Sequence, residues 1–183
     1  MQAGLSEKTE QHNLYLVGFM GAGKSTVGAA LAALLQRRHL DTDRLIEKQV
    51  GRRIADIFAK DGENFFRELE SRVLADICRH GNLVVSLGGG SVASPGNWDL
   101  IRQSGKSIYL AWPAAVLANR ILTDPARPLV AMSAESSRTE ELSKLLATRR
   151  PLYERCDLTI HCKAGLAPAE VAAEIVNRIR EKA

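Results

Sequence analysis

The residues with the clearest chemical meaning lie near the start of the chain. Residues 18–26 read GFMGAGKST and match the phosphate-loop pattern G-x-x-x-x-G-K-[ST]. Glycines in such a loop let backbone N–H groups turn toward phosphate oxygens where a Cβ would clash. Lys24 adds a positive charge for the outer phosphates, and Ser25 offers a hydroxyl to Mg2+. The alternative is a glycine-rich turn with a solvated lysine, but the pattern favours a nucleoside triphosphate site.

A second group of oxygen ligands follows in HLDTD, at residues 39–43. The apolar run at 83–87 carries no acidic residue for the metal, so we expect the carboxylate to come from Asp41 or Asp43. In an extended chain these two side chains point the same way, so one could hold Mg2+ through water while the other contacts a substrate hydroxyl. The alternative is that a residue in 41–43 caps a following helix.

Arg67 and Glu70 are three residues apart on a segment with helical periodicity. One interpretation is a surface ion pair that Glu63 joins. The other is an arginine held by glutamate so that its planar fork binds a substrate carboxylate. The triplet Gly88, Gly89 and Gly90 follows an apolar run, and glycine at the carboxyl end of a strand allows a ligand close to the backbone.

Further arginines surround residues 123–137, TDPARPLVAMSAESS, which contain two prolines and show no clear period. We expect this segment to be a long loop. A mobile loop bearing Arg127 would exclude water and neutralise charge on a transferred phosphoryl group. The alternative is a solvated Arg127, with Arg149 and Arg150 complementing a helix C-terminus.

Apolar runs that alternate with helical stripes must position these residues. We expect strands at 14–17, 38–41, 83–87, 107–111 and 158–160. We expect helices after the phosphate loop and at 54–60, 63–79, 95–103, 113–122, 140–149 and 171–179, with Pro151 ending the helix at 140–149. This order predicts parallel strands with right-handed crossovers, and therefore a three-layer α/β sandwich formed by residues 1–183 as one domain.

The composition of the chain excludes several classes of protein. Of the 183 residues, 45% are hydrophobic and 25% charged, which is typical of a globular chain. No apolar run approaches the ~20 residues of a membrane helix, and the first twelve residues are polar, so we expect a flexible start without a secretory signal. The net charge of +4 could serve nucleic acid or a pocket for small anions; the basic residues are scattered and lack aromatic interleaving, and composition alone does not choose between the two. The three cysteines lack CxxC spacing and suggest reduced thiols in the cytoplasm.

Taken together, these motifs resemble the shikimate kinase family. The shared pattern runs in register through GxxGxGKST, LDTD, DGENFFRELE, SLGGG, ARPL and RRPLYE, from about Tyr15 to Glu154. The resemblance implies a P-loop kinase fold with a five-stranded parallel sheet, a helical substrate-binding region and a lid at about 122–137. It implies Mg2+-dependent transfer of the ATP γ-phosphate to the 3-hydroxyl of shikimate, in aromatic amino acid biosynthesis. His39 stands where the family more often has an apolar residue.

The resemblance also implies roles for individual residues, taken from their place in these motifs. The catalytic residues would be Lys24, Asp43 and Arg127. ATP would contact Gly21, Ala22, Gly23, Lys24, Ser25, Thr26, Arg120 and Arg127, with Arg120 against adenine. Mg2+ would contact Ser25 and, through water, Asp41. Shikimate would contact Asp43, Arg67, Gly88, Gly89, Gly90 and Arg149.

Two other readings of the chain stay open. Another small P-loop kinase, acting on gluconate or a nucleoside monophosphate, would need the same phosphate loop. A nucleotide-switch module without phosphotransfer would also need it, although the chain has no N-K-x-D guanine motif. We expect a cytoplasmic monomer whose partners are shikimate and ATP, with no nucleic acid or membrane partner.

Overall fold

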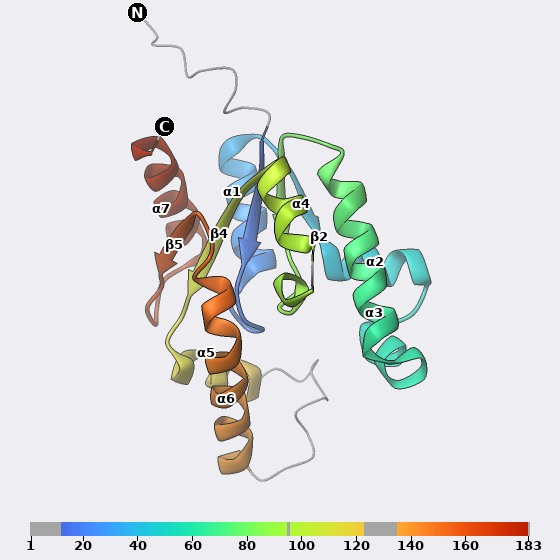
Figure 1. The fold of residues 1–183 in the computed structure, drawn as a ribbon. Coiled ribbons are helices and arrows are strands. Elements are labelled where there is room, and N and C mark those ends of the chain that lie inside the picture. The colour runs from blue at the N-terminus through green and yellow to red at the C-terminus, as the bar shows by residue number, and fades with distance from the viewer. Residues whose placement is uncertain (1–11, 95, 123–134, 183) are drawn as a thin grey trace, which may run out of the picture.

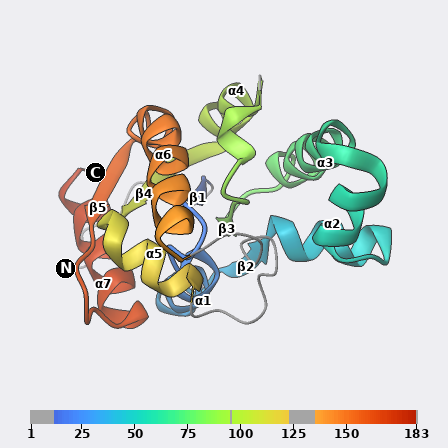
Figure 2. The same cartoon turned by 90° about the horizontal axis from the view of Figure 1, so that it is seen from below.

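Short apolar runs and helix-length segments alternate along the chain and fold into a parallel sheet covered by helices (Figures 1 and 2). The computed structural model describes residues 12–94, 96–122 and 135–182. The strands are β1 (Asn13–Val17), β2 (Arg38–Asp41), β3 (Leu83–Ser86), β4 (Gly105–Ala111) and β5 (Leu158–His161). The helices are α1 (Lys24–Leu35), α2 (Thr42–Val50), α3 (Ile54–Cys78), the 3-10 helix η1 (Ser91–Ala93), α4 (Asn97–Ser104), α5 (Ala114–Leu122), α6 (Glu135–Tyr153) and α7 (Pro168–Glu181).

The sheet has five strands in the order β2-β3-β1-β4-β5, and all neighbours pair in parallel. Every residue of β1 and β3 is buried, because helices cover both faces of the central strands. A fully buried Leu such as Leu16 contributes about 1.5–3 kcal/mol to stability. Helices α1 and α7 cover one face and α4 lies on the other, as Figure 2 shows. The predicted three-layer α/β sandwich is confirmed.

Parallel pairing brings the carboxyl ends of the strands to one edge of the sheet. The register places Leu16 of β1 and Asp41 of β2 on either side of Ser86 in β3. The phosphate loop, residues 41–43 and the glycine triplet follow three adjacent strands at this edge. Helix α5 and much of α6 lie beyond the same edge, at the bottom of Figure 1.

Two predicted helix boundaries were wrong. Helix α6 begins at Glu135, inside the expected loop, and it continues past Pro151 to Tyr153. Proline lacks an N–H and removes one helical hydrogen bond, but near the end of a helix few further bonds depend on it. The predicted break between the helices at 54–60 and 63–79 is confirmed: the element labelled α3 is interrupted at Gly62, where φ is 81° and ψ 174°. This left-handed φ suits glycine.

Some expectations fall outside the described residues. These are the flexible start, apart from His12, and the lid between 123 and 134, with Arg127. Within the described ranges, no helix has the length and apolarity needed to cross a bilayer.

Candidate active site

The phosphate loop connects the buried strand β1 to helix α1. Gly21 and Gly23 both have φ near +76°, a left-handed conformation that glycine adopts without strain. Gly23 is the N-cap of α1, so the unpaired N–H groups of the first helical turn face the loop. The Lys24 ammonium donates to the carbonyl oxygens of Gly18, at 2.8 Å, and Phe19, at 3.0 Å. The sequence-predicted residues Gly21 to Thr26 therefore form one continuous turn whose N–H groups are suited to an anion.

Two residues beyond β4 support this turn. Trp112 Nε1 donates to the carbonyl of Ala22 at 3.0 Å, and Arg120 Nη1 donates to the carbonyl of Gly21 at 3.3 Å. The Arg120 guanidinium also stacks on the indole ring of Trp112, 3.8 Å from its centroid. The sequence analysis did not select Trp112. No local sequence pattern indicates the hydrogen bond from the Trp112 indole N–H to the loop, because Trp112 and Ala22 are 90 residues apart in the chain.

Asp41 joins the phosphate loop to helix α2. Ser25 Oγ donates to Asp41 Oδ2 at 2.5 Å, while Asp41 Oδ1 accepts the backbone N–H groups of Asp43 and Arg44 at 3.1 and 3.2 Å. The helix-capping alternative is therefore confirmed for Asp41. The expectation that Asp41 and Asp43 project together from an extended chain is wrong, because Asp43 lies in the first turn of α2.

The Ser25–Asp41 pair fits a magnesium ion held mainly by phosphates. A hydroxyl and a carboxylate are hard oxygen ligands, and Mg2+ in kinases uses one or two protein oxygens together with phosphates and water. Among the described residues, no cluster of three or more His, Cys, Asp or Glu side chains could hold a metal by itself. The donor set is thus too small for an all-protein cage and suited to a metal bound with nucleotide.

Asp43 presents a carboxylate to the interior of the site. Its Oδ1 atom is buried and has no hydrogen-bond partner in the described structure. Burial raises the pKa of Asp43 to about 6; Lys24 opposes the rise, and the negative charges of Asp41, Glu70 and Glu47 add to it. An unpaired buried oxygen with a raised pKa is suited to accept a proton from a nearby hydroxyl.

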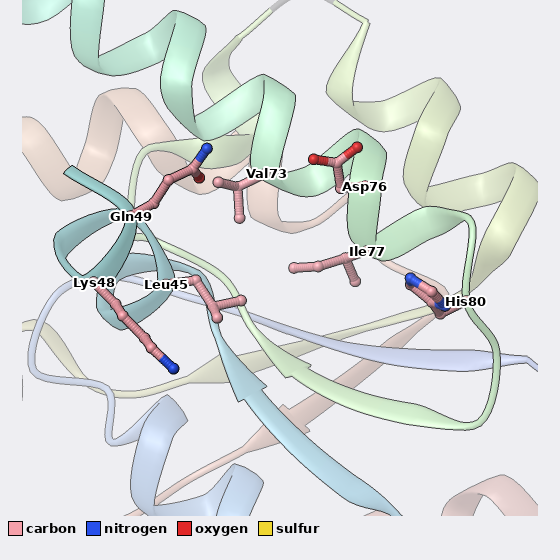
Figure 3. Close-up of a pocket in the computed structure, with 7 residues that line it drawn as sticks. All are labelled: Leu45, Lys48, Gln49, Val73, Asp76, Ile77 and His80. Atoms are coloured by element: carbon pink, nitrogen blue, oxygen red, sulfur yellow. The ribbon is translucent and has the colours of Figure 1, made fainter.

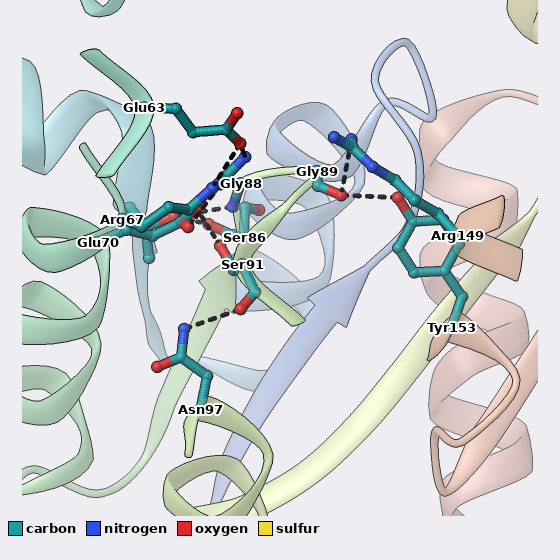
Figure 4. Close-up of polar contacts among 11 residues, drawn as sticks. Glu63, Arg67, Glu70, Ser86, Gly88, Gly89, Ser91, Asn97, Arg149 and Tyr153 are labelled. Carbon is teal, nitrogen blue, oxygen red and sulfur yellow. Dashed lines mark hydrogen bonds and ion pairs between the residues drawn. The ribbon is translucent and has the colours of Figure 1, made fainter. Parts of the chain in front are cut away.

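Arg67 projects from α3 toward the glycine triplet and is held by two glutamates (Figure 4). Its Nη1 donates to Glu70 Oε2 at 2.8 Å, and its Nε and Nη2 donate to Glu63 Oε1 at 3.2 and 2.9 Å. The Glu70 side chain is only 1% exposed, and its Oε1 accepts Ser91 Oγ at 2.5 Å. The contact with Glu63 matches the surface ion pair, and the contact with buried Glu70 shows an arginine held by glutamate; binding of a substrate carboxylate stays a prediction.

The glycines leave no room for side chains. A Cβ at Gly88 would lie 2.5 Å from Glu70 Oε1 and 2.6 Å from Asp43 Oδ1. A Cβ at Gly90 would lie 2.5 and 2.6 Å from the terminal nitrogens of Arg67. The backbone of the triplet is therefore in direct contact with the charged groups predicted to bind substrate.

Helix α6 reaches the triplet from the other side. Arg149 Nη1 and the Tyr153 hydroxyl both donate to the carbonyl of Gly89, at 3.4 and 2.6 Å. Burial raises the pKa of Tyr153 to about 12, despite the opposing charge of Arg149, so the hydroxyl stays protonated and remains a donor. Sequence reasoning missed Tyr153, although its spacing of four residues from Arg149 places both on one face of a helix.

The described structure thus brings together the predicted residues of the phosphate loop, Asp41, Asp43, Arg67, the triplet and Arg149. Arg120 is beside the loop, and Arg127 lies outside the described residues. A separate hollow of 430 Å3 lies between α2 and the end of α3 (Figure 3). None of these predicted residues lines it; its lining residues are Leu45, Lys48, Gln49, Val73, Asp76, Ile77 and His80.

Sequence comparisons show which family the chain resembles. A family model described as "Shikimate kinase" matches residues 20–180. The chain is 40% identical over 168 residues to the shikimate kinase of Persephonella marina, covering 92% of this chain and 99% of that protein. It is 42% identical over 179 residues to the shikimate kinase of a Synechococcus strain, covering 97% and 87% of the two chains.

Solved structures extend the comparison to the fold. The shikimate kinase from Acinetobacter baumannii in complex with shikimate is 37% identical, with a TM-score of 0.85 and coverage of 97% and 98%. A gluconokinase from Sinorhizobium meliloti superposes with a TM-score of 0.53 at 17% identity, over 94% of this chain and 97% of that one. The second likeness shows the fold alone.

Proposed function

The chain belongs to the shikimate kinase family of ATP-dependent phosphotransferases, and we propose that it transfers the γ-phosphate of ATP to the 3-hydroxyl of shikimate at the site described above. One observation carries the proposal: Arg67 and Arg149, from α3 and α6, contact the same glycine triplet from two sides. Two cations beside a compact backbone surface suit a small hydroxylated acid.

The nucleotide would bind at the start of α1. The N–H groups of the phosphate loop and the first helical turn would receive the phosphate oxygens, and Lys24 would exchange its two carbonyl partners for the outer phosphates. Arg120 would present its planar group to the adenine. Ser25 and, through water, Asp41 would hold Mg2+, which neutralises charge on the phosphates. Arg127 is assigned to the transferred phosphoryl group from its sequence motif alone.

Shikimate would bind between the two arginines and the triplet. Arg67 and Arg149 would share its carboxylate, and the amides of Gly88, Gly89 and Gly90 would contact its hydroxyls. Asp43 would orient the attacking hydroxyl and accept its proton, since its Oδ1 is buried without a partner. Most of the rate enhancement would come from positioning and from fixed positive charge near the transferred phosphate.

The decisive experiment measures ADP release in a coupled assay. We expect release with shikimate and Mg2+, little release without Mg2+, and none with gluconate or a nucleoside monophosphate. Arg67→Ala should raise the KM for shikimate while the KM for ATP stays near its original value. Release with gluconate alone would falsify the substrate assignment.

Two further observations support our proposal that the protein is a monomer in the cytoplasm. The described residues of one chain supply the phosphate loop, Asp43 and both arginines, so a second copy is not needed to complete the site, and we propose a monomer. All three cysteines are free, which suits a reducing cytoplasm.

A further inference from the structure

Two carboxylates and the main chain at Gly90 lie around the Arg67 guanidinium. Glu63 Oε1 takes the edge formed by Nε and Nη2, and Glu70 accepts from Nη1. The main chain at Gly90 lies close to the two terminal nitrogens, because a Cβ there would lie 2.5 and 2.6 Å from them. A substrate carboxylate that binds this arginine through Nε and Nη2 must therefore displace Glu63.

The three neighbours differ in how easily they can move. Glu70 is 1% exposed and is fixed on its other oxygen by Ser91. Gly90 is main chain, and its carbonyl accepts the N–H of Ala93 at 2.9 Å. The Glu63 side chain is 62% exposed and directly follows the break in α3 at Gly62. Glu63 is consequently the neighbour that can turn into solvent at the smallest cost.

We propose that Glu63 is an internal competitor that occupies the place of the substrate carboxylate and is displaced when substrate binds. The inference rests on the proposed role of Arg67 in binding that carboxylate. Both groups are carboxylates seeking the same Nε and Nη2 donors, so the observed affinity is reduced by the fraction of time that Glu63 occupies them. A neutral ligand lacks the charge to replace an ion pair, so Glu63 also favours acids over their uncharged analogues.

Calorimetric titration of Glu63→Gln with shikimate, without ATP, tests the proposal. Exposed ion pairs are weak, so we expect about two- to fivefold tighter binding, with the KM for ATP unchanged. The methyl ester of shikimate should gain nothing. Glu68→Gln is the matched control: Glu68 pairs with Arg72 at the same spacing on the same helix, 3.3 Å apart, and both side chains are exposed.

Unchanged or weaker binding of shikimate to Glu63→Gln would overturn the proposal, as would an equal gain for the ester. Glu63→Ala, checked for folding by its thermal transition, should repeat the gain without leaving an amide that can still accept a hydrogen bond. Arg67→Ala distinguishes an error in the proposed role of Arg67 from an error in the proposed role of Glu63. If it leaves shikimate binding intact, the role of Arg67 is wrong; if it weakens binding while Glu63→Gln has no effect, only the competitor role is wrong.

Discussion

The nucleotide side and the substrate side of the site are built in different ways. The nucleotide side is one continuous segment whose binding groups are mostly backbone N–H, and Lys24 rests on two neutral carbonyls. The substrate side is assembled from α2, α3, the triplet after β3, and α6. There Arg67 forms ion pairs with Glu63 and Glu70, and the nearby Asp43 has a buried Oδ1 without a hydrogen-bond partner in the described structure.

The two sides differ in the protein groups that a ligand must displace when it binds. On the nucleotide side, phosphate would replace the carbonyl oxygens of Gly18 and Phe19 as hydrogen-bond acceptors of Lys24. These carbonyls belong to the loop and stay in place. On the substrate side, the ligand competes with negative charges of the protein itself. We therefore expect binding on the substrate side to depend more strongly on pH than binding on the nucleotide side, and we expect changes on one side to affect binding on the other less than on their own side.

The largest expected effect is on the nucleotide side. Lys24→Met removes the charge that would stabilise the transferred phosphoryl group, and kcat/KM for ATP should fall about 10³-fold. Equilibrium binding of shikimate should change far less, although its pH dependence should shift upward because Lys24 lowers the pKa of Asp43. The matched control is Lys48→Met, an exposed lysine on α2. Loss of shikimate binding in Lys24→Met would show that the two sides act as one unit.

Asp43→Asn should lower kcat about 10²-fold by removing the proton acceptor. In the unsubstituted protein, kcat/KM for shikimate should rise with pH through about 6 as Asp43 ionises, and the variant should lose this limb. The pH–rate profiles of both proteins provide the measurement. A variant with full turnover, or with the same acid limb, is incompatible with the assigned base.

The same substitution should stabilise the fold. The pKa of Asp43 is raised in the folded state, so its contribution to the free energy of unfolding is fully present below the ordinary pKa and is lost as pH rises through about 6. Asp43→Asn removes that loss and should gain about 1–3 kcal/mol at pH 7, with little gain at pH 4. Urea unfolding at the two pH values checks the sign; a destabilised variant at pH 7 would show that the charged form is favoured.

Arg149→Ala should raise the KM for shikimate about tenfold to a hundredfold, the usual cost of losing a charged hydrogen-bond donor. The KM for ATP should change little. Arg150→Ala is the control, because Arg150 is the adjacent, exposed residue on the same helix. Equal changes in the two KM values would assign Arg149 to the nucleotide instead.

The smallest effect is expected where the two sides meet. Tyr153→Phe removes the hydroxyl that fixes the Gly89 carbonyl and should raise the KM for shikimate about threefold. Tyr109→Phe is matched, since its ring packs against Tyr153 with centroids 5.3 Å apart. A Cβ at Gly89 would lie 3.3 Å from the Met20 N of the phosphate loop. A parallel rise in the KM for ATP would therefore mean that Tyr153 positions both sides.

The sheet was predictable because its signals are local. Residues 38–41 were predicted as a strand and form β2 with the same bounds, and the phosphate loop lies between a strand and a helix as its motif requires. Prediction failed at Pro151, where the rule that proline ends a helix did not allow for a terminal turn. It also failed at Asp43, because the sequence allowed both an extended segment and a cap at Asp41, and the cap places Asp43 in the first turn of α2.

For the site, residue types were easier to predict than their partners. Arg67 and Arg149 could be chosen from their motifs, but their contact with Gly90 and Gly89 depends on strand order and helix placement that one sequence does not state. Ser91 and Trp112 were missed for the same reason. A hydroxyl after three glycines and an indole after a strand have no distinctive spacing, and their partners are remote in the chain.

His39, the residue that departs from the family's apolar preference, ties three positions together. Its Nε2 lies 2.9 Å from Ser86 Oγ, which donates to the Lys24 carbonyl, and a Cβ at Gly28 would lie 2.6 Å from both His39 Nε2 and Ser86 Oγ. Even one methyl group at position 28 would collide with this pair. A larger residue at 28 therefore requires that both His39 and Ser86 move or become smaller, so the effects of substitutions at these three positions depend on one another.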